Sequence, residues 1–285
     1  MIQPKHIEEF SEIINNYDGY IFDQYGVLHN GEKIIIDAEN CLIKLIANNK
    51  KLIILSNSGK TENINKERMN QLGSRVIQHI KVITSGDVCR KLLVQNSGPC
   101  KGLGENYYII GSNDSSLDKS QYLRVDSIAE ADFCLLISTV GFKHWEKVDG
   151  LLNKMKKLNI TLVCANPDLF GLAGDLISKS PGTIAAMYKR KNGKVINIGK
   201  PYIEVYNEAL NYLKIKDKNK ILMIGDSIHN DILGANRAGI DCLFITSGVH
   251  KETFKNLKKD NFSKIIKHVT KQNYSLNYYM HKVRF

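Results

Sequence analysis

The sequence predicts an α/β fold in which helices cover a parallel sheet. Strand-like apolar runs alternate with helix-like segments through both ends of the chain, a pattern that favours parallel strands joined by helices. The middle of the chain has its own alternation and predicts a second α/β unit inserted into the first. The 285 residues are enough for one large core with such an insertion, or for two ordinary domains.

The N-terminal part of the chain predicts three strands and two helices. Tyr20–Phe22 is apolar at every position, as expected for a strand buried on both faces of a sheet. Gly73 follows the second helix and supplies the left-handed residue that commonly ends helices. In chain order we expect the strand Tyr20–Phe22, the helix Ala38–Asn48, the strand Lys51–Ser56, the helix Thr61–Leu72 and the strand Val82–Ser85.

The inserted unit is expected to begin near Asp87 and to end near Lys191–Gly193, where polar residues and a glycine form a turn signal. This organisation predicts a discontinuous core of residues 1–87 and 190–285 and an inserted domain of residues 88–189. Inside the insertion we expect the strands Tyr107–Ile110, Phe133–Ile137 and Ile160–Cys164 and a helix around Trp145–Leu158. After it we expect the strand Val195–Ile198, the helix Tyr202–Leu213, the strand Ile221–Ile224, the helix Ile232–Ala238 and the strand Cys242–Ile245.

The composition indicates a globular protein, with 43% hydrophobic and 24% charged residues. No apolar run approaches the roughly 18 residues of a membrane-spanning helix, and Met1–Phe10 lacks a signal-peptide pattern. We therefore expect a cytoplasmic protein with no membrane partner. The six cysteines are scattered without zinc spacing, which predicts reduced thiols, several of them in the core.

The net charge of +11 is concentrated near the C-terminus, where His250–Phe285 holds nine Lys or Arg residues against Glu252 and Asp260. These basic residues are spaced through a segment that predicts an amphipathic helix followed by a loose end, and no motif that reads nucleic acid is present. We therefore expect a solvated basic face and no specific nucleic-acid partner. Such a surface would also attract small phosphorylated molecules.

Asp23 is the first candidate for chemistry, because it ends an apolar strand just before a turn at Gly26. The carboxyl ends of parallel strands are where α/β proteins bind their ligands. A carboxylate there can attack phosphorus and form an aspartyl-phosphate. On its own, however, Asp23 is equally well explained as the cap of a turn.

Two further segments could bind a phosphoryl group. Ser56, Asn57 and Ser58 follow a buried strand, and their hydroxyl and amide groups can hold phosphate oxygens. Lys200, between Gly199 and a proline, stands between a strand and a helix and can neutralise the same group. Each segment taken alone could be an ordinary turn or helix cap.

Asp226 and Asp231 follow the strand Ile221–Ile224 and could hold a hard cation such as Mg²⁺, which prefers oxygen ligands. We expect Asp226 to bind the metal directly together with Asp23. Asp231 would help through a metal-bound water or by orienting Lys200. Helix capping explains either residue alone, but four such signals in one order, all at strand ends, favour a single site.

Together these motifs resemble those of the haloacid dehalogenase-like hydrolases. The resemblance spans roughly residues 17–247 and rests on Asp23-x-Tyr25-Gly26-Val27, Ser56-Asn57-Ser58, Gly199-Lys200-Pro201, and Gly225-Asp226 with Asp231. The long insertion, which contains Asn166-Pro167-Asp168 and Pro181–Ile184, is similar to that of subclass IIA, the nitrophenylphosphatase-like branch.

The resemblance implies a Rossmann-like core, an inserted α/β cap domain, Mg²⁺ as cofactor, and hydrolysis of small phosphomonoesters through a phosphoaspartate on Asp23. The substrate class would be a sugar phosphate, a nucleotide or pyridoxal phosphate. The metal ligands would be Asp23, Asp226 and the main-chain carbonyl of Tyr25. Caps of this kind often contribute dimer contacts in the family, so a homodimer is the assembly that the resemblance allows.

The resemblance also assigns substrate contacts. Ser56 and Lys200 would clamp the phosphoryl oxygens, with help from Asn57 and Ser58. Asp168 is a candidate to face the leaving group, although an Asn-Pro-Asp turn is as readily structural.

Tyr25 departs from the family pattern, because most phosphatases that resemble this chain have an aspartate there, which protonates the leaving oxygen and later activates water. A phenol with a pKa of about 10 is a poor base at neutral pH, and loss of acid–base catalysis typically costs about 10² to 10⁴-fold in rate. Three functions therefore stay open. The first is a phosphatase in which His29, a cap residue or metal-bound water moves the proton, with His29 itself expected to be an exposed loop residue. The second is a non-catalytic phosphate-ligand binding or regulatory protein, and the third is a phosphotransferase.

Overall fold

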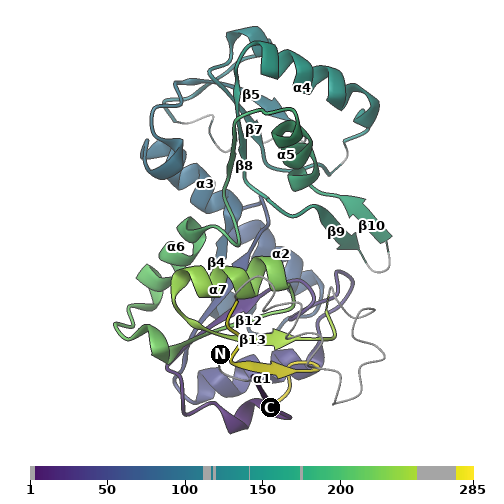
Figure 1. The fold of residues 1–285 in the computed structure, drawn as a ribbon. Coiled ribbons are helices and arrows are strands. Elements are labelled where there is room, and N and C mark those ends of the chain that lie inside the picture. Colours follow the sequence, from purple (N-terminus) through teal and green to yellow (C-terminus); the bar gives the residue numbers. More distant parts are fainter. Residues whose placement is uncertain (1–3, 112–116, 118–119, 141, 174–175, 249–273) are drawn as a thin grey trace. The chain divides into compact units, whose positions relative to one another are not determined.

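The computed structural model describes residues 4–111, 117, 120–140, 142–173, 176–248 and 274–285 of the chain. The chain divides into two compact units. Unit 1 comprises Met1–Ser56, Asn63–Ile83 and Lys200–Phe285, and unit 2 comprises Asn57–Glu62 and Thr84–Gly199. Figure 1 colours the chain from its N-terminus to its C-terminus and labels many of the helices and strands of both units.

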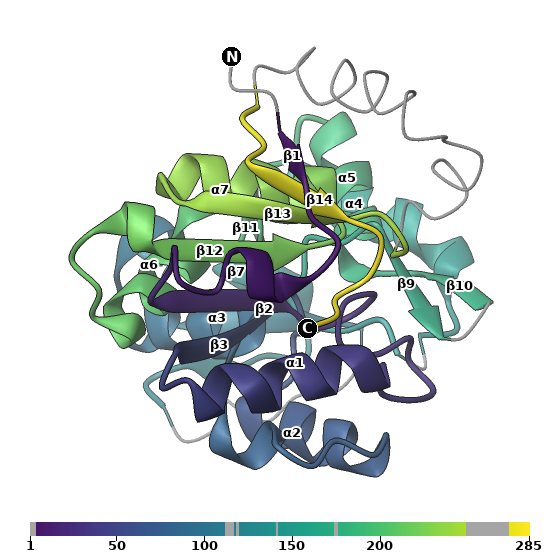
Figure 2. The same ribbon diagram turned by 90° about the horizontal axis from the view of Figure 1, so that it is seen from below.

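Unit 1 is built on a seven-stranded sheet with the strand order β1-β14-β13-β12-β2-β3-β4. The pairings from β1 across to β3 are all parallel. Figure 2 shows this order from β1 to β3, with the N-terminal strand β1 beside the C-terminal strand β14. The strands are β1 Lys5–His6, β2 Gly19–Asp23, β3 Lys51–Ser56, β4 Lys81–Thr84, β12 Ile221–Gly225, β13 Asp241–Ile245 and β14 Tyr278–Met280.

Alternate residues of these strands pack against helix α1, because successive side chains of a strand point to opposite faces of the sheet. Tyr20 and Phe22 lie in one hydrophobic cluster with Leu42 and Leu45 of α1, and all four are at most 1% exposed. The helices of unit 1 are α1 Ile36–Ala47, α2 Glu62–Gln71, α6 Ile203–Leu213 and α7 Leu233–Ala238, with short helical turns at η1 Phe10–Glu12, η2 Ile77–His79, η6 Lys218–Lys220 and η7 Ile228–Ile232.

Unit 2 has its own parallel sheet of five strands in the order β11-β8-β7-β5-β6, and a separate two-stranded antiparallel sheet made by β9 and β10. Helices α4 and α5 pack on one face of the five-stranded sheet, where Leu152 and Ile184 join strand residues such as Leu136 and Leu162 in a buried cluster. The elements of unit 2 are α3 Ser85–Val94, η3 Gly98–Cys100, β5 Asn106–Ile110, β6 Leu123–Arg124, η4 Ile128–Glu130, β7 Phe133–Leu136, η5 Trp145–Lys147, α4 Val148–Lys157, β8 Thr161–Cys164, β9 Phe170–Ala173, β10 Leu176–Lys179, α5 Pro181–Arg190 and β11 Val195–Asn197.

These two parallel sheets with their helices confirm the predicted α/β fold class. The predicted loose end at the C-terminus is wrong, because Tyr278–Met280 pairs with β13 on one side and β1 on the other. Arg284 is held as well, since its side chain donates to the Glu8 carbonyl at 2.7 Å. The basic helix predicted before this strand falls on residues 249–273, outside the described part of the chain.

The six cysteines are all free and buried, as the scattered spacing predicted. Burial raises the pKa values of Cys41, Cys134, Cys164 and Cys242 to about 12, which keeps these thiols protonated. Within the described residues, none of the helices has both the length and the apolar character needed to cross a membrane.

Candidate active site

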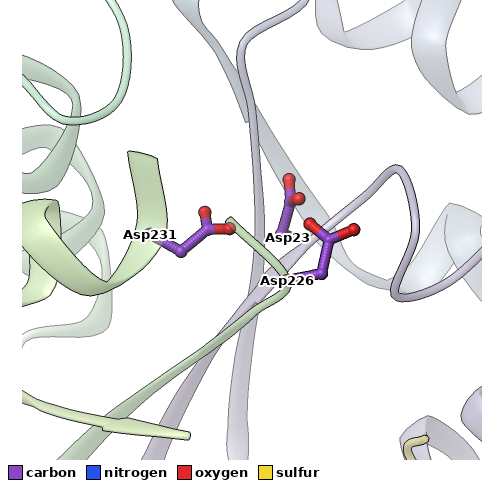
Figure 3. A group of neighbouring side chains, drawn as sticks. All are labelled: Asp23, Asp226 and Asp231. Atoms are coloured by element: carbon purple, nitrogen blue, oxygen red, sulfur yellow. The ribbon is translucent and has the colours of Figure 1, made fainter. Parts of the chain in front are cut away.

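Two aspartates reach one edge of the unit 1 sheet because their strands are parallel neighbours. Asp23 is the last residue of β2, and Asp226 comes directly after β12. Phe22 pairs in register with Ile224, so the two carboxylates leave the sheet at adjacent strand ends. Figure 3 shows the side chains of Asp23 and Asp226 beside that of Asp231. One oxygen from each of the three carboxylates lies within 4.8 Å of the others.

Asp231 and Lys200 are buried against this pair of aspartates. Asp231 lies in η7, the helical turn after β12, where its Oδ2 accepts a hydrogen bond of 3.0 Å from the Ser227 N–H. Lys200 Nζ forms an ion pair of 2.8 Å with Asp231 Oδ1 and a second, shorter one with Asp23 Oδ1. The side chain of Lys200 is 3% exposed and that of Asp231 is 0% exposed. Lys200 is therefore fixed between two carboxylates.

Charge and burial oppose one another in this cluster. Burial alone would lower the pKa of Lys200, but the charges of Asp23 and Asp231 outweigh that effect and raise its pKa above the usual value. Lys200 is consequently a permanent cation. For Asp231, burial and the nearby charge of Asp23 raise the pKa to about 6, although Lys200 acts in the opposite direction. Three carboxylates around one ammonium leave an excess of negative charge, which a cation would relieve.

The Asp226 carboxylate is enclosed by the main chain of two glycines. A Cβ atom at Gly26 would lie 1.9 Å from Asp226 Oδ2, and one at Gly248 would lie 2.0 Å from the same oxygen. Gly26 also has φ +79°, a left-handed conformation that glycine adopts without strain. Buried carboxylate oxygens in a cradle of this kind are the donors that a hard divalent cation prefers, so Asp23, Asp226 and Asp231 fit such an ion.

The Tyr25 side chain is tied to the loop that follows β2. Its hydroxyl donates a hydrogen bond of 2.8 Å to the Asn30 carbonyl. Its ring meets the ring of His29 edge to face, with centroids 5.4 Å apart. The phenol proton is thus already used in a hydrogen bond within the loop.

His29 is not the exposed loop residue that we expected, because it is only 3% exposed. The Gly31 N–H donates to His29 Nδ1 at 2.9 Å, so this nitrogen carries no proton. Burial, with a smaller effect from the charge of Arg68, lowers the pKa of His29 to about 4. His29 is therefore a neutral acceptor that holds its loop together.

The predicted phosphate-binding residues lie in both units. Ser56 ends β3 in unit 1 and is 8% exposed, whereas Asn57, Ser58 and Asp168 belong to unit 2. Asn57 Nδ2 donates to Asp168 Oδ1 at 2.7 Å, and Ser58 Oγ accepts from the Lys60 N–H at 3.2 Å. The structure thus brings together Asn57 and Asp168 in unit 2, and Asp23, Lys200, Asp226 and Asp231 in unit 1.

Three residues that shape these groups were not predicted. Ser227 caps η7 by accepting from the Asn230 N–H at 3.2 Å, and a serine just before a helical segment is a common N-cap that could have been recognised. Gly248 encloses Asp226, and the Ser85 hydroxyl donates to Asn57 Oδ1 at 3.2 Å, but neither residue belongs to a motif. Their roles depend on which distant segments they contact, so one sequence contains no sign of them.

Comparison with known proteins places two stretches of the chain in one family. Residues 20–121 match the family model described as haloacid dehalogenase-like hydrolase, and residues 197–271 match one described as HAD-hydrolase-like. Chronophin from Mus musculus is 24% identical over 246 residues, which cover 84% of each chain. Phosphoglycolate phosphatase 2 from Arabidopsis thaliana is 23% identical over 266 residues, 86% of this chain and 87% of that protein.

Solved structures share the fold over nearly the whole chain. A haloacid dehalogenase-like hydrolase from Brucella suis 1330 has a TM-score of 0.81 and 25% identity, covering 97% of this chain and 99% of that one. The p-nitrophenyl phosphatase from Archaeoglobus fulgidus has a TM-score of 0.70 and 21% identity, covering 93% and 95% respectively.

Proposed function

The chain belongs to the haloacid dehalogenase-like hydrolases, as its ordered motifs predicted, and from this membership we propose that it is a phosphatase of small phosphomonoesters. The observation that carries the proposal is the buried cluster at the edge of the unit 1 sheet. There, Lys200 lies between Asp23 and Asp231, and Asp226 completes a set of three converging carboxylates. This set contains a nucleophile, a fixed cation and oxygen ligands, the parts that phosphoryl transfer requires.

Asp23 is the proposed nucleophile. One of its carboxylate oxygens attacks phosphorus, a new O–P bond forms as the ester P–O bond breaks, and the leaving oxygen takes up a proton. Water then attacks the phosphoaspartate, inorganic phosphate departs, and the Asp23 carboxylate is restored. Lys200 is charged throughout and neutralises the phosphoryl oxygens, while Asp231 holds its ammonium by the 2.8 Å ion pair.

The proposed cofactor is Mg²⁺, held by Asp23, Asp226 and the main-chain carbonyl of Tyr25, with Asp231 behind them. When bound, Mg²⁺ would withdraw charge from the phosphoryl oxygens and offset the repulsion between the carboxylates and the substrate. The enclosure of the Asp226 carboxylate by Gly26 and Gly248 supports its assignment as a direct ligand.

The remaining site residues are proposed to bind the substrate. Ser56 would clamp the phosphoryl oxygens with Lys200, and Asn57 and Ser58 would support it from the following loop. The inserted domain, expected over residues 88–189, would select the leaving group. Because two relatives are named as phosphatases, one of them of phosphoglycolate, we propose small phosphorylated metabolites as substrates.

The Tyr25 side chain sets the expected rate. Its hydroxyl is bonded to the Asn30 carbonyl, and His29 is neutral and accepts through Nδ1. Neither side chain supplies the proton that the family aspartate at position 25 would supply. We therefore propose that turnover is slow, with water as the source of the proton.

A phosphate-release screen over small phosphomonoesters with Mg²⁺ tests the proposal. Wild-type protein should release phosphate from at least one ester, and Asp23→Asn, which preserves shape and removes the nucleophile, should not. Equal release by the two proteins, or none by either, would overturn it. If phosphate accumulates on Asp23 and leaves only when an acceptor alcohol is added, the protein is a phosphotransferase instead.

A further inference from the structure

The carboxamide of Asn57 is held at both ends within unit 2. Its Nδ2 donates to Asp168 Oδ1 at 2.7 Å, and its Oδ1 accepts from the Ser85 hydroxyl at 3.2 Å. Asn57 is 5% exposed and Ser85 is 0% exposed, so both hydrogen bonds are shielded from water. Asp168 is restrained in turn, because its N–H donates to Asn166 Oδ1 at 3.0 Å.

The main chain at Gly199 lies directly against this group. A Cβ atom at Gly199 would be 2.8 Å from Asn57 Oδ1, 2.7 Å from Ser85 Oγ and 2.5 Å from Pro167 Cδ. Gly199 also has φ +142°, a conformation that side-chain-bearing residues rarely adopt. Four segments of unit 2 that are distant in the sequence therefore meet around one carboxamide.

Chain connectivity links this meeting point to the proposed phosphate-binding residues. Asn57 is covalently joined to Ser56, and Gly199 is covalently joined to Lys200. A restraint on Asn57 and Gly199 is thus a restraint on the main chain from which both phosphoryl contacts extend. We propose that Asp168 is a positioning residue for this reaction and acts through Asn57, an inference that rests on the proposed phosphatase function.

A carboxylate suits this task because it only accepts hydrogen bonds. It therefore binds the NH₂ end of the Asn57 carboxamide and directs the oxygen end towards the Ser85 hydroxyl. This role differs from the one that the family resemblance assigned, in which Asp168 would face the leaving group. The two roles make different kinetic predictions.

A double-mutant cycle separates them, measured as kcat and KM for phosphate release with two chemically unlike esters. Asp168→Ala should lower kcat about 10 to 100-fold by the same factor for both esters, with KM little changed, because only geometry is lost. Asp168→Asn keeps an oxygen acceptor and should recover kcat to within about fivefold of wild type. In an Asn57→Ala background, Asp168→Ala should lower kcat no further.

The control is Asp149→Ala, which breaks an exposed ion pair with Lys191 in the same unit and should leave kcat unchanged.

Multiplicative losses in the double variant, or a loss with Asp168→Ala that depends on the leaving group, would overturn the proposal. Amide hydrogen exchange of residues 57–62 gives a readout that needs no activity, and it should rise in Asp168→Ala but not in Asp149→Ala. Unchanged exchange in Asp168→Ala also contradicts the proposal. If wild-type protein releases no phosphate, the proposed function fails, whereas the exchange measurement still tests whether Asp168 restrains Asn57.

Discussion

At the residue scale, the proposed function makes the side chain at position 25 the limit on how fast the proposed nucleophile, Asp23, can turn over. The Tyr25 hydroxyl donates a hydrogen bond to the Asn30 carbonyl, so the phenol proton is already bonded within the loop. Tyr25→Asp should raise the rate of phosphate release, by up to about 10² to 10⁴-fold, because it restores a group that can give and take protons near neutral pH.

Tyr25→Phe is the matched control, since it removes the same hydrogen bond without adding a carboxylate. It should change the rate little. An unchanged rate in Tyr25→Asp, with fold and Mg²⁺ binding intact, would mean that another group already supplies the proton.

Gly26 is the residue where a single methyl group should disable the proposed metal site. An alanine there would place Cβ 1.9 Å from Asp226 Oδ2, so the carboxylate must move. Gly73 is a useful control because it also has a positive φ, +102°, but has nothing within 4 Å of an added Cβ. Both alanine variants should lose stability by about 1–2 kcal/mol from the left-handed main chain. Gly26→Ala alone should also lose Mg²⁺-dependent phosphate release, and equal activity in the two variants would contradict the proposed role of Asp226.

At the element scale, we expect the C-terminal strand β14 to stabilise unit 1 through its one buried side chain, that of Met280. Met280 is 1% exposed in the unit 1 core, and its carbonyl accepts from the Thr246 N–H at 3.0 Å. Met280→Ala should lower the free energy of unfolding by about 2–5 kcal/mol, because it leaves a cavity beside β13. Denaturant unfolding followed by circular dichroism measures this.

The neighbouring Lys282→Ala provides the contrast. Lys282 pairs with Asp37 at 2.6 Å, but the two side chains are 50% and 43% exposed. Loss of this ion pair should lower the free energy of unfolding by no more than about 1 kcal/mol. If Met280→Ala and Lys282→Ala lowered the free energy of unfolding by similar amounts, β14 would not stabilise unit 1 through packing.

The difference between predicted and missed elements follows from where their stability originates. Lys51–Ser56 and Ile221–Gly225 are long and apolar, so their burial is evident from their own residues. Lys5–His6 and Tyr278–Met280 are only two and three residues long, and they become strands because β14 and β13 offer main-chain groups for pairing. Their structure is decided by tertiary pairing, which local propensity does not encode.

The same distinction applies to the site. Asp23 and Asp226 could be predicted together because parallel neighbouring strands must bring their ends to one edge of the sheet. The burial of His29 could not be predicted from the sequence, because it depends on a loop that folds back on itself. The hydrogen bond between Asn57 and Asp168 joins residues 111 positions apart in the sequence, and no spacing rule predicts such a contact.

At the scale of the whole molecule, a chain with a net charge of +11 gathers three carboxylates, two of them buried, beside one ammonium. Mutual repulsion among Asp23, Asp226 and Asp231 opposes folding, and a cation bound only to the folded protein relieves it. Mg²⁺ at about 100 times its dissociation constant should therefore raise the free energy of unfolding by about 2.7 kcal/mol, seen as a higher unfolding temperature that EDTA reverses.

Asp226→Asn should abolish this shift. Without metal it should be no less stable than wild type, because the substitution removes one of the repelling charges. Asp149→Asn, which changes an exposed aspartate of unit 2, should retain the full shift. An equal shift in Asp226→Asn would mean that Mg²⁺ stabilises the fold from another position, and the assignment of Asp226 as a metal ligand would be wrong.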